Sequence, residues 1–147
     1  ALGIPATGNR EELAVAIDAM AVVTRDLPAY FLTHVCYGAF EFIYPNMLKL
    51  PVENFDLEMS NSELDLLGLF SKAPFTKDLS FGVYDVHSHK VDSPETLKRR
   101  IVKALDVLKP EQVWVDPDCG LKTRTVEEAV AQLKSMQAAV HEVRKTL

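Results

Sequence analysis

The sequence contains little cysteine, no long apolar run and no excess of positive charge. Its two cysteines, Cys36 and Cys119, allow one disulfide, two metal ligands or two inert core thiols, and are too few for a disulfide scaffold. No segment approaches the roughly 18 uninterrupted apolar residues of a transmembrane helix. The N-terminal residues 1–5 lack the charge and the following apolar run of a signal peptide. We therefore expect a soluble, cytoplasmic protein that does not enter a membrane.

The charge balance argues against nucleic acid as the partner. Lysine and arginine total 16 against 21 aspartate and glutamate residues, which gives a net charge of −5. Phosphate binding requires a basic face that this composition does not supply. With 48% apolar and 25% charged residues, the 147-residue chain has an ordinary globular composition and enough length for one core. Without repeats, linkers or low-complexity segments, it reads as a single domain over residues 1–147.

Strand-like and helix-like segments alternate along most of the chain. A helix is expected within residues 1–27, and four βα units are expected within residues 28–147. The expected strands are residues 30–35, 55–59, 79–86 and 112–115. Such alternation favours an α/β fold with a parallel sheet and right-handed crossovers. Two closures fit, a small open doubly wound sheet or half of a (β/α)₈ barrel, because a whole barrel needs about 250 residues.

Capping residues and apolar spacing predict where the helices begin and which side they bury. Asn9 is expected to cap the first helix, residues 60–63 the third, Ser93 the fourth and Thr125, with Glu128, the last. A helix broken or kinked by Pro45 is expected over about 39–48. The expected buried positions of the first helix are Leu13, Ile17, Met20 and Val23. Those of the last helix are Val126, Val130, Leu133, Met136 or Gln137, and Val140.

Five residues with metal-binding or acid–base side chains fall at or after the ends of the four strands: His34, Cys36, Glu58, His87 and Cys119. The carboxyl ends of parallel strands open on one face, so these side chains are expected to converge. His34 and Cys36 are two apart and point to the same side of an extended strand. Two sulfurs, one imidazole and one carboxylate suit Zn²⁺, and a displaceable glutamate favours a catalytic site. Taken singly, each residue also fits a core thiol, a solvated acid or a polar loop.

Four segments around these residues resemble the cobalamin-independent methionine synthase family, in the order and with the spacing of that family. The segments are Thr33-His34-Val35-Cys36-Tyr37, Leu57-Glu58-Met59-Ser60-Asn61-Ser62-Glu63, Gly82-Val83-Tyr84-Asp85-Val86-His87-Ser88 and Asp116-Pro117-Asp118-Cys119-Gly120-Leu121-Lys122-Thr123-Arg124. The resemblance covers about residues 28–140. The family usually has Asn where this chain has Asp116, and His89-Lys90 also departs from its pattern.

The resemblance implies the last four βα units of a TIM (β/α)₈ barrel and a zinc-dependent methyltransferase. It places His34, Cys36, Glu58 and Cys119 on the zinc ligands and His87 on the proton donor, whose ring Asp85 is expected to orient. The reaction it implies is methyl transfer to the thiol of homocysteine, which forms methionine. The implied donor is a methylated tetrahydropteroyl-glutamate or a methyl-corrinoid.

The resemblance leaves two alternatives and one gap. A corrinoid-dependent thiol methyltransferase of the uroporphyrinogen-decarboxylase-like type also uses a His-x-Cys and a later Cys. A truncated, non-catalytic zinc-binding fragment is the other alternative. Residues 1–27 hold nothing like the family's homocysteine-binding motifs, which are expected to lie outside this chain. Because a half-barrel exposes two sheet edges, we expect either pairing of two copies or a missing N-terminal half-barrel.

Overall fold

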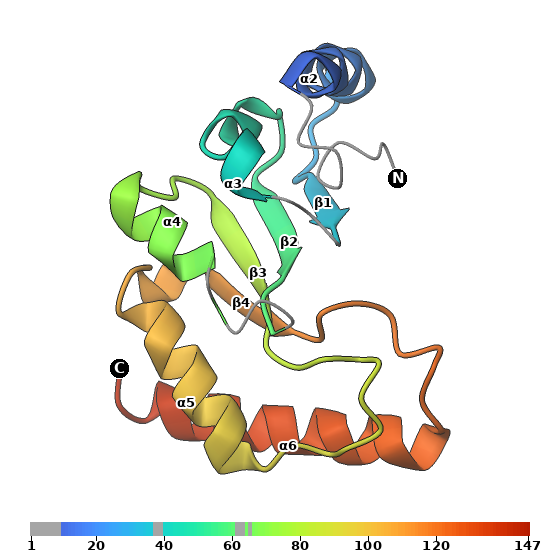
Figure 1. Cartoon of the computed structure of the whole chain (residues 1–147), viewed down its shortest axis with the longest axis vertical. Coiled ribbons are helices and arrows are strands. Elements are labelled where there is room, and N and C mark those ends of the chain that lie inside the picture. The colour runs from blue at the N-terminus through green and yellow to red at the C-terminus, as the bar shows by residue number, and fades with distance from the viewer. Residues whose placement is uncertain (1–9, 37–39, 61–63, 65) are drawn as a thin grey trace.

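The computed structural model describes residues 10–36, 40–60, 64 and 66–147 and contains one parallel sheet (Figure 1). Its strands are β1 (Leu32–Val35), β2 (Asn54–Glu58), β3 (Asp78–Gly82) and β4 (Val113–Asp116), in the spatial order β1-β2-β3-β4. A doubly wound sheet reverses its strand order at a switch point, whereas this order is consecutive. The arrangement is therefore a segment of a barrel, and the expected half-barrel is confirmed.

Helices occupy the chain between the strands and beyond both edges of the sheet. They are α2 (Arg10–Thr24), α3 (Phe40–Ile43), α4 (Leu66–Lys72), α5 (Pro94–Leu105) and α6 (Val126–Arg144). Two short 3₁₀ helices, η1 (Asn46–Lys49) and η2 (Pro110–Gln112), follow α3 and precede β4. Figure 1 shows α3, α4 and α5 along one side of the sheet, with α2 and α6 at opposite ends of the molecule. Among the described residues, no helix combines the length and apolar character needed to cross a membrane.

The central strands have one apolar and one polar face. Phe55 and Leu57 on β2 are almost fully buried, as are Leu79 and Phe81 on β3. Because side chains alternate along a strand, these residues point toward the helices and the residues between them toward the concave face. On β2 those intervening residues are Asn54, Asp56 and Glu58. The core thus lies between sheet and helices, while the concave face carries the polar groups.

The predicted caps of α5 and α6 are confirmed. Ser93 Oγ accepts a hydrogen bond from the backbone N–H of Thr96 at 3.3 Å. Thr125 Oγ1 accepts from the Glu128 N–H at 3.2 Å, and the Glu128 carboxylate accepts from the Thr125 N–H at 2.9 Å. The expected caps at Asn9 and at residues 61–63 lie outside the described residues.

Two strand boundaries and one helix differ from the prediction by more than one residue. The first strand begins at Leu32 rather than at residue 30, and the helix expected over 39–48 is split into α3 and η1 by a cis Tyr44-Pro45 peptide. The third strand ends at Gly82 instead of continuing to residue 86. Val83, Tyr84 and Val86 are nevertheless at most 1% exposed. Their apolar, β-prone character reflects burial in the loop that follows β3.

The predicted buried side of α6 is wrong. Val126, Val130 and Leu133 are 74%, 45% and 38% exposed, and only Met136 and Val140 are partly buried. The buried residues of α6 are Gln132, Ser135, Ala139 and Val143.

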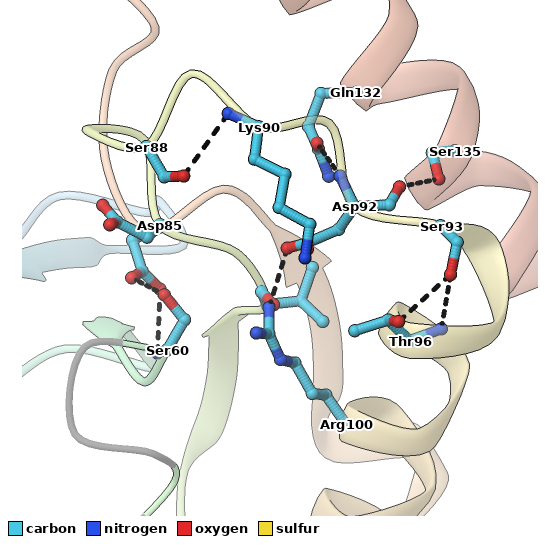
Figure 2. A network of polar contacts seen from close by, with 12 residues as sticks. Ser60, Asp85, Ser88, Lys90, Asp92, Ser93, Thr96, Arg100, Gln132 and Ser135 are labelled. Carbon is cyan, nitrogen blue, oxygen red and sulfur yellow. Dashed lines mark hydrogen bonds and ion pairs between the residues drawn. The ribbon is translucent and has the colours of Figure 1, made fainter.

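Polar contacts with the segment before α5 select this side of α6 (Figure 2). Gln132 Oε1 accepts from the Asp92 backbone N–H at 2.7 Å, and Ser135 Oγ donates to the Asp92 carbonyl at 2.5 Å. Arg100 also holds Asp92, through an ion pair of 3.1 Å. The apolar stripe is consequently left outside. In α2, Leu13 is buried as expected, whereas Val23 is 65% exposed.

Gly82 is the glycine that the fold requires most. A Cβ at this position would lie 2.8 Å from the Leu57 carbonyl oxygen and closer still to the Asp118 carboxylate. We predict that Gly82→Ala lowers the free energy of unfolding by about 1–3 kcal/mol through overpacking. In the exposed α4 position Gly68, where nothing lies within 4 Å of an added Cβ, alanine should instead stabilise the chain by about 0.5–1 kcal/mol. Urea denaturation measures both changes, and equal effects would contradict the close approach at Gly82.

Candidate metal centre

The structure brings three of the predicted ligands together. The ligand atoms of His34, Cys36 and Cys119 all lie within 4.8 Å of one another. His34 is on β1 and Cys36 directly follows it, so strand alternation points both side chains to the concave side. Cys119 comes from the loop after β4, which is the opposite edge strand of the sheet. The site therefore depends on how that loop crosses the carboxyl ends of the strands.

Asp118 anchors the loop that carries Cys119. Its carboxylate accepts hydrogen bonds from the backbone N–H groups of Met59 and Ser60, both at 3.2 Å, and from the Ser60 hydroxyl. The Asp118 backbone N–H donates to the Tyr84 carbonyl at 3.1 Å. Asp118 is fully buried and sits where Gly82 has no side chain. The loop thus passes over β3 and is fixed to the end of β2, which places Cys119 beside Cys36.

Asp56 holds the ring of His34. The two residues are register partners on β2 and β1, and Asp56 Oδ2 lies 2.7 Å from His34 Nδ1. Histidines that bind metals commonly donate their second ring N–H to a carboxylate in this way. The contact leaves Nε2 of His34 as the nitrogen available to an ion. Burial raises the pKa of Asp56, and the neighbouring His34 opposes that rise.

The sulfur atoms sit among negative groups. Burial raises the pKa of the Cys36 thiol, and the charges of Glu58 and of Cys119 raise it further. Two thiolates and a carboxylate at such close range repel one another unless a cation lies between them. The donor set and its electrostatics therefore fit a bound Zn²⁺, which prefers sulfur and nitrogen ligands.

Glu58 lies next to this centre but is not a member of the three-residue ligand group. It is the last residue of β2, its side chain is 5% exposed, and its charge acts on Cys36. The structure thus places a buried carboxylate at the predicted position. Its role as a fourth ligand stays a prediction.

His87 and Asp85 lie on the loop after β3. His87 is exposed, and its backbone N–H donates to Asp85 Oδ1 at 2.8 Å. This hydrogen bond shapes the loop through the backbone, so ring orientation by Asp85 stays a prediction. Arg124 braces the same loop by donating to the Asp85 carbonyl at 2.7 Å, with its guanidinium over the Tyr84 ring. These contacts of Arg124 therefore stabilise the loop after β3.

Sequence reasoning missed the supporting roles of Asp56 and Asp118 and the burial of Asp116. Burial raises the pKa of Asp116 to about 7 and that of Asp118 to about 6, and hydrogen bonds from Ser60 and Met59 oppose the rise at Asp118. The signal for Asp56 was present, because Asn54, Asp56 and Glu58 alternate with apolar residues on one strand. The anchoring role of Asp118 depends on a contact between residues 58 or 59 positions apart, which no local pattern contains.

Comparison with known proteins agrees with this geometry. The family model described as "Cobalamin-independent synthase, Catalytic domain" matches residues 6–142. The chain belongs to this family. The structure is therefore that of part of a cobalamin-independent synthase catalytic domain.

Curated relatives are much longer than this chain. The 5-methyltetrahydropteroyltriglutamate–homocysteine methyltransferases of Histophilus somni and Campylobacter jejuni subsp. doylei are 39% and 41% identical over 115 residues, which is 78% of this chain and 15% of each relative. The enzyme of that name from Syntrophotalea carbinolica is 36% identical over 137 residues, or 92% of this chain and 18% of the relative. The chain thus spans less than a fifth of the length of these relatives.

A solved structure shows the same fold. A B12-independent methionine synthase from Shewanella, in complex with selenomethionine, superposes with a TM-score of 0.83 at 21% sequence identity. The match covers 97% of this chain and 47% of the Shewanella chain. The cobalamin-independent synthase domain described here therefore has the fold of about half of that structure.

The raised pKa of Asp116 predicts a loss of stability with rising pH. An unfolded aspartate has a pKa near 3.9, so between about pH 4 and 7 the folded chain binds more protons than the unfolded chain. Stability then falls as the pH rises through that window. We expect Asp116→Asn to reduce this loss in metal-free protein and to leave the part that the raised pKa of Asp118 contributes. Urea denaturation at a series of pH values tests it, with exposed Asp18→Asn as the control. A pH dependence that is unchanged by Asp116→Asn would contradict the assignment.

The contact between Asp56 and His34 predicts an effect on metal affinity. Asp56→Asn should weaken zinc binding about 10–100-fold, because the ring loses the carboxylate that fixes its orientation and raises its basicity. Competition with a chromogenic chelator measures the change. The matched control is Asp78→Asn, since Asp78 begins β3, at the opposite end of the strands from the three ligands, and accepts a hydrogen bond from Tyr30. Equal affinities for Asp56→Asn and the unaltered chain would show that Asp56 does not support the metal site.

Proposed function

We propose that this domain carries the zinc half of a methyltransferase that methylates the thiol of homocysteine to form methionine. The observation that supports this most is the convergence of His34, Cys36 and Cys119, from opposite edges of the sheet, on one point at the strand ends. Membership in the cobalamin-independent synthase family favours this reaction over that of the uroporphyrinogen-decarboxylase-like enzymes. The names of the curated relatives support homocysteine as the acceptor.

The ligand set we propose is His34, Cys36, Cys119 and Glu58. The first three side chains are already grouped, with the ring of His34 held by Asp56. Glu58 would be the most easily displaced of the four, because a carboxylate is a weaker zinc ligand than a thiolate. This proposal gives each strand-end segment of β1, β2 and β4 a defined part in one centre.

Free thiols titrate near pH 8.5, so homocysteine is mostly protonated at neutral pH. When bound, Zn²⁺ would supply the positive charge that favours the thiolate form of the substrate. Cys36 and Cys119 contribute negative charge of their own, which leaves a nearby substrate sulfur electron-rich and nucleophilic. That effect is the reason for a sulfur-rich site rather than a three-histidine site.

We propose that His87 donates a proton to the demethylated donor as it departs from the transferred methyl group. It is exposed on the loop after β3, and Asp85 and Arg124 fix the backbone of that loop. The donor is a methylated tetrahydropteroyl-glutamate, with a methyl-corrinoid as the alternative. Contacts to the amino-acid part of homocysteine and to most of the donor are proposed to come from outside these 147 residues.

The decisive variant for the metal assignment is Cys119→Ser. The unaltered chain should hold equimolar zinc, and Cys119→Ser should lose it, because one of two thiolate ligands is replaced by a weak hydroxyl ligand. Elemental analysis after gel filtration measures zinc, and circular dichroism checks that the variant is folded. His141→Ala, which removes a histidine of α6 far from the three ligands in sequence, should keep its zinc. Full zinc retention by folded Cys119→Ser would overturn the ligand assignment.

Methyl transfer is tested separately from metal binding. Methionine formation is measured with methyl-tetrahydropteroyl-glutamate or methylcobalamin as the donor. The barrel half that the relatives contain and this chain does not match is added to the assay. We expect activity with the folate donor. Cys119→Ser should lose this activity, and His87→Ala should reduce it while keeping its zinc. Loss of zinc in His87→Ala would assign that histidine to the metal instead of to proton transfer.

A further inference from the structure

The loop between β3 and α5, residues 83–93, contains His87 and forms neither helix nor strand. Backbone polar groups outside regular structure need other partners. Here four successive carbonyls each accept a hydrogen bond from outside the loop, at 2.7–3.1 Å. They are the carbonyls of Val83, Tyr84, Asp85 and Val86. The first part of the loop, up to the residue before His87, is therefore fixed by other segments of the chain.

Three of the four donors belong to the segment that carries Cys119, residues 116–124. They are the backbone N–H of Asp118, the hydroxyl of Thr123 and the guanidinium of Arg124. Figure 1 shows this segment and the loop after β3 running side by side beyond the sheet. The segment that supplies a metal ligand thus also holds the loop that carries His87.

Arg124 bridges the two sides of His87. Its Nη2 donates to the Asp85 carbonyl at 2.7 Å and its Nη1 to the Lys90 carbonyl at 3.4 Å. The guanidinium lies over the ring of the fully buried Tyr84, with its central carbon 5.6 Å from the ring centroid. Arginine suits this position because its planar fork presents several donors in fixed directions, whereas a lysine has one compact ammonium group on a flexible stem.

Asp85 connects the Arg124 contact to His87. The Asp85 carbonyl accepts from Arg124, while Asp85 Oδ1 accepts from the backbone N–H of His87 at 2.8 Å. A second contact near the tip of the loop joins His89 to Glu128 at 3.0 Å, but the His89 side chain is 66% exposed and exposed ion pairs contribute little. The partly buried, charge-assisted contact of Arg124 is therefore the stronger restraint.

We propose that Arg124 is a positioning residue, which holds His87 in place for proton transfer, while Asp118 separately places Cys119 at the metal centre. Asp118 contacts the end of β2 and Arg124 contacts the loop after β3, so the two residues divide the work of one segment. This role of Arg124 rests on the proposed proton transfer by His87. A displacement of about 1 Å at a reacting group can lower the rate about 100-fold, so a fixed loop has a direct effect on catalysis.

Two lysine substitutions in the zinc-loaded chain test this role. Arg124→Lys keeps the charge but loses the fork, so deuterium exchange of the His87 backbone N–H should become about tenfold faster. Arg100→Lys is the matched control, because Arg100 donates to the Val83 carbonyl at the start of the loop and should leave that exchange rate unchanged. Nuclear magnetic resonance measures the exchange, and both variants should keep equimolar zinc. Arg124→Gln, which should behave as Arg124→Lys does, provides a second folded variant.

Methionine formation gives a readout that a purely structural role would not separate. The assay contains the barrel half that the relatives have and this chain does not match. Arg124→Lys should lower kcat about 10–100-fold, because the proton donor is misplaced. It should leave the KM for homocysteine unchanged, because the metal centre stays intact.

Three results would overturn this role of Arg124. The first is unchanged exchange of the His87 N–H in folded Arg124→Lys and Arg124→Gln. The second is equally fast exchange in Arg100→Lys, which would indicate general loosening of the domain. The third is loss of zinc in Arg124→Lys, which would assign Arg124 to the metal segment. An unaltered chain that forms no methionine would contradict the proposed function alone, because amide exchange still decides whether Arg124 holds His87.

Discussion

The structure depends on one anchoring contact, the attachment of Asp118 to the end of β2. Its carboxylate accepts from two consecutive backbone N–H groups and the Ser60 hydroxyl, and it reaches them over Gly82, where a side chain would block the way. This contact draws the loop after β4 across the strand ends. Without it, Cys119 would stay above its own strand, on the far edge of the sheet from Cys36. The metal centre is therefore a consequence of loop anchoring as much as of ligand identity.

A second constraint is the concentration of negative groups on the concave face. Asp56, Glu58, Asp116 and Asp118 lie on or just beyond β2 and β4, and burial raises the pKa of three of them. Cys36 experiences the same environment, with Glu58 and Cys119 raising its pKa. Bringing such groups together costs free energy unless protons or a cation offset their charge. The arrangement accordingly favours cation binding.

The alternation of strands and helices, the caps of α5 and α6 and the convergence of His34, Cys36 and Cys119 could be predicted from local sequence patterns and the geometry of parallel strands. The strand order could not, because those patterns also fitted a doubly wound sheet, and only the family resemblance favoured the half-barrel. The sequence was also insufficient for α6, where hydrogen bonds between Asp92 and the side chains of Gln132 and Ser135 turn the apolar stripe outward. Helical periodicity identifies an apolar face but not the surface that covers it. Asp118 was missed for a related reason, since its partners are distant in sequence.

The central claim is that two cysteines from opposite edges of the sheet bind one metal ion. Zinc K-edge X-ray absorption of the purified chain tests it most directly, because sulfur and lighter ligands give distinct shells. The account predicts two sulfur ligands at about 2.3 Å together with nitrogen or oxygen ligands at about 2.0–2.2 Å. A shell made only of nitrogen and oxygen would contradict it, because Cys36 and Cys119 would then have no part in the site.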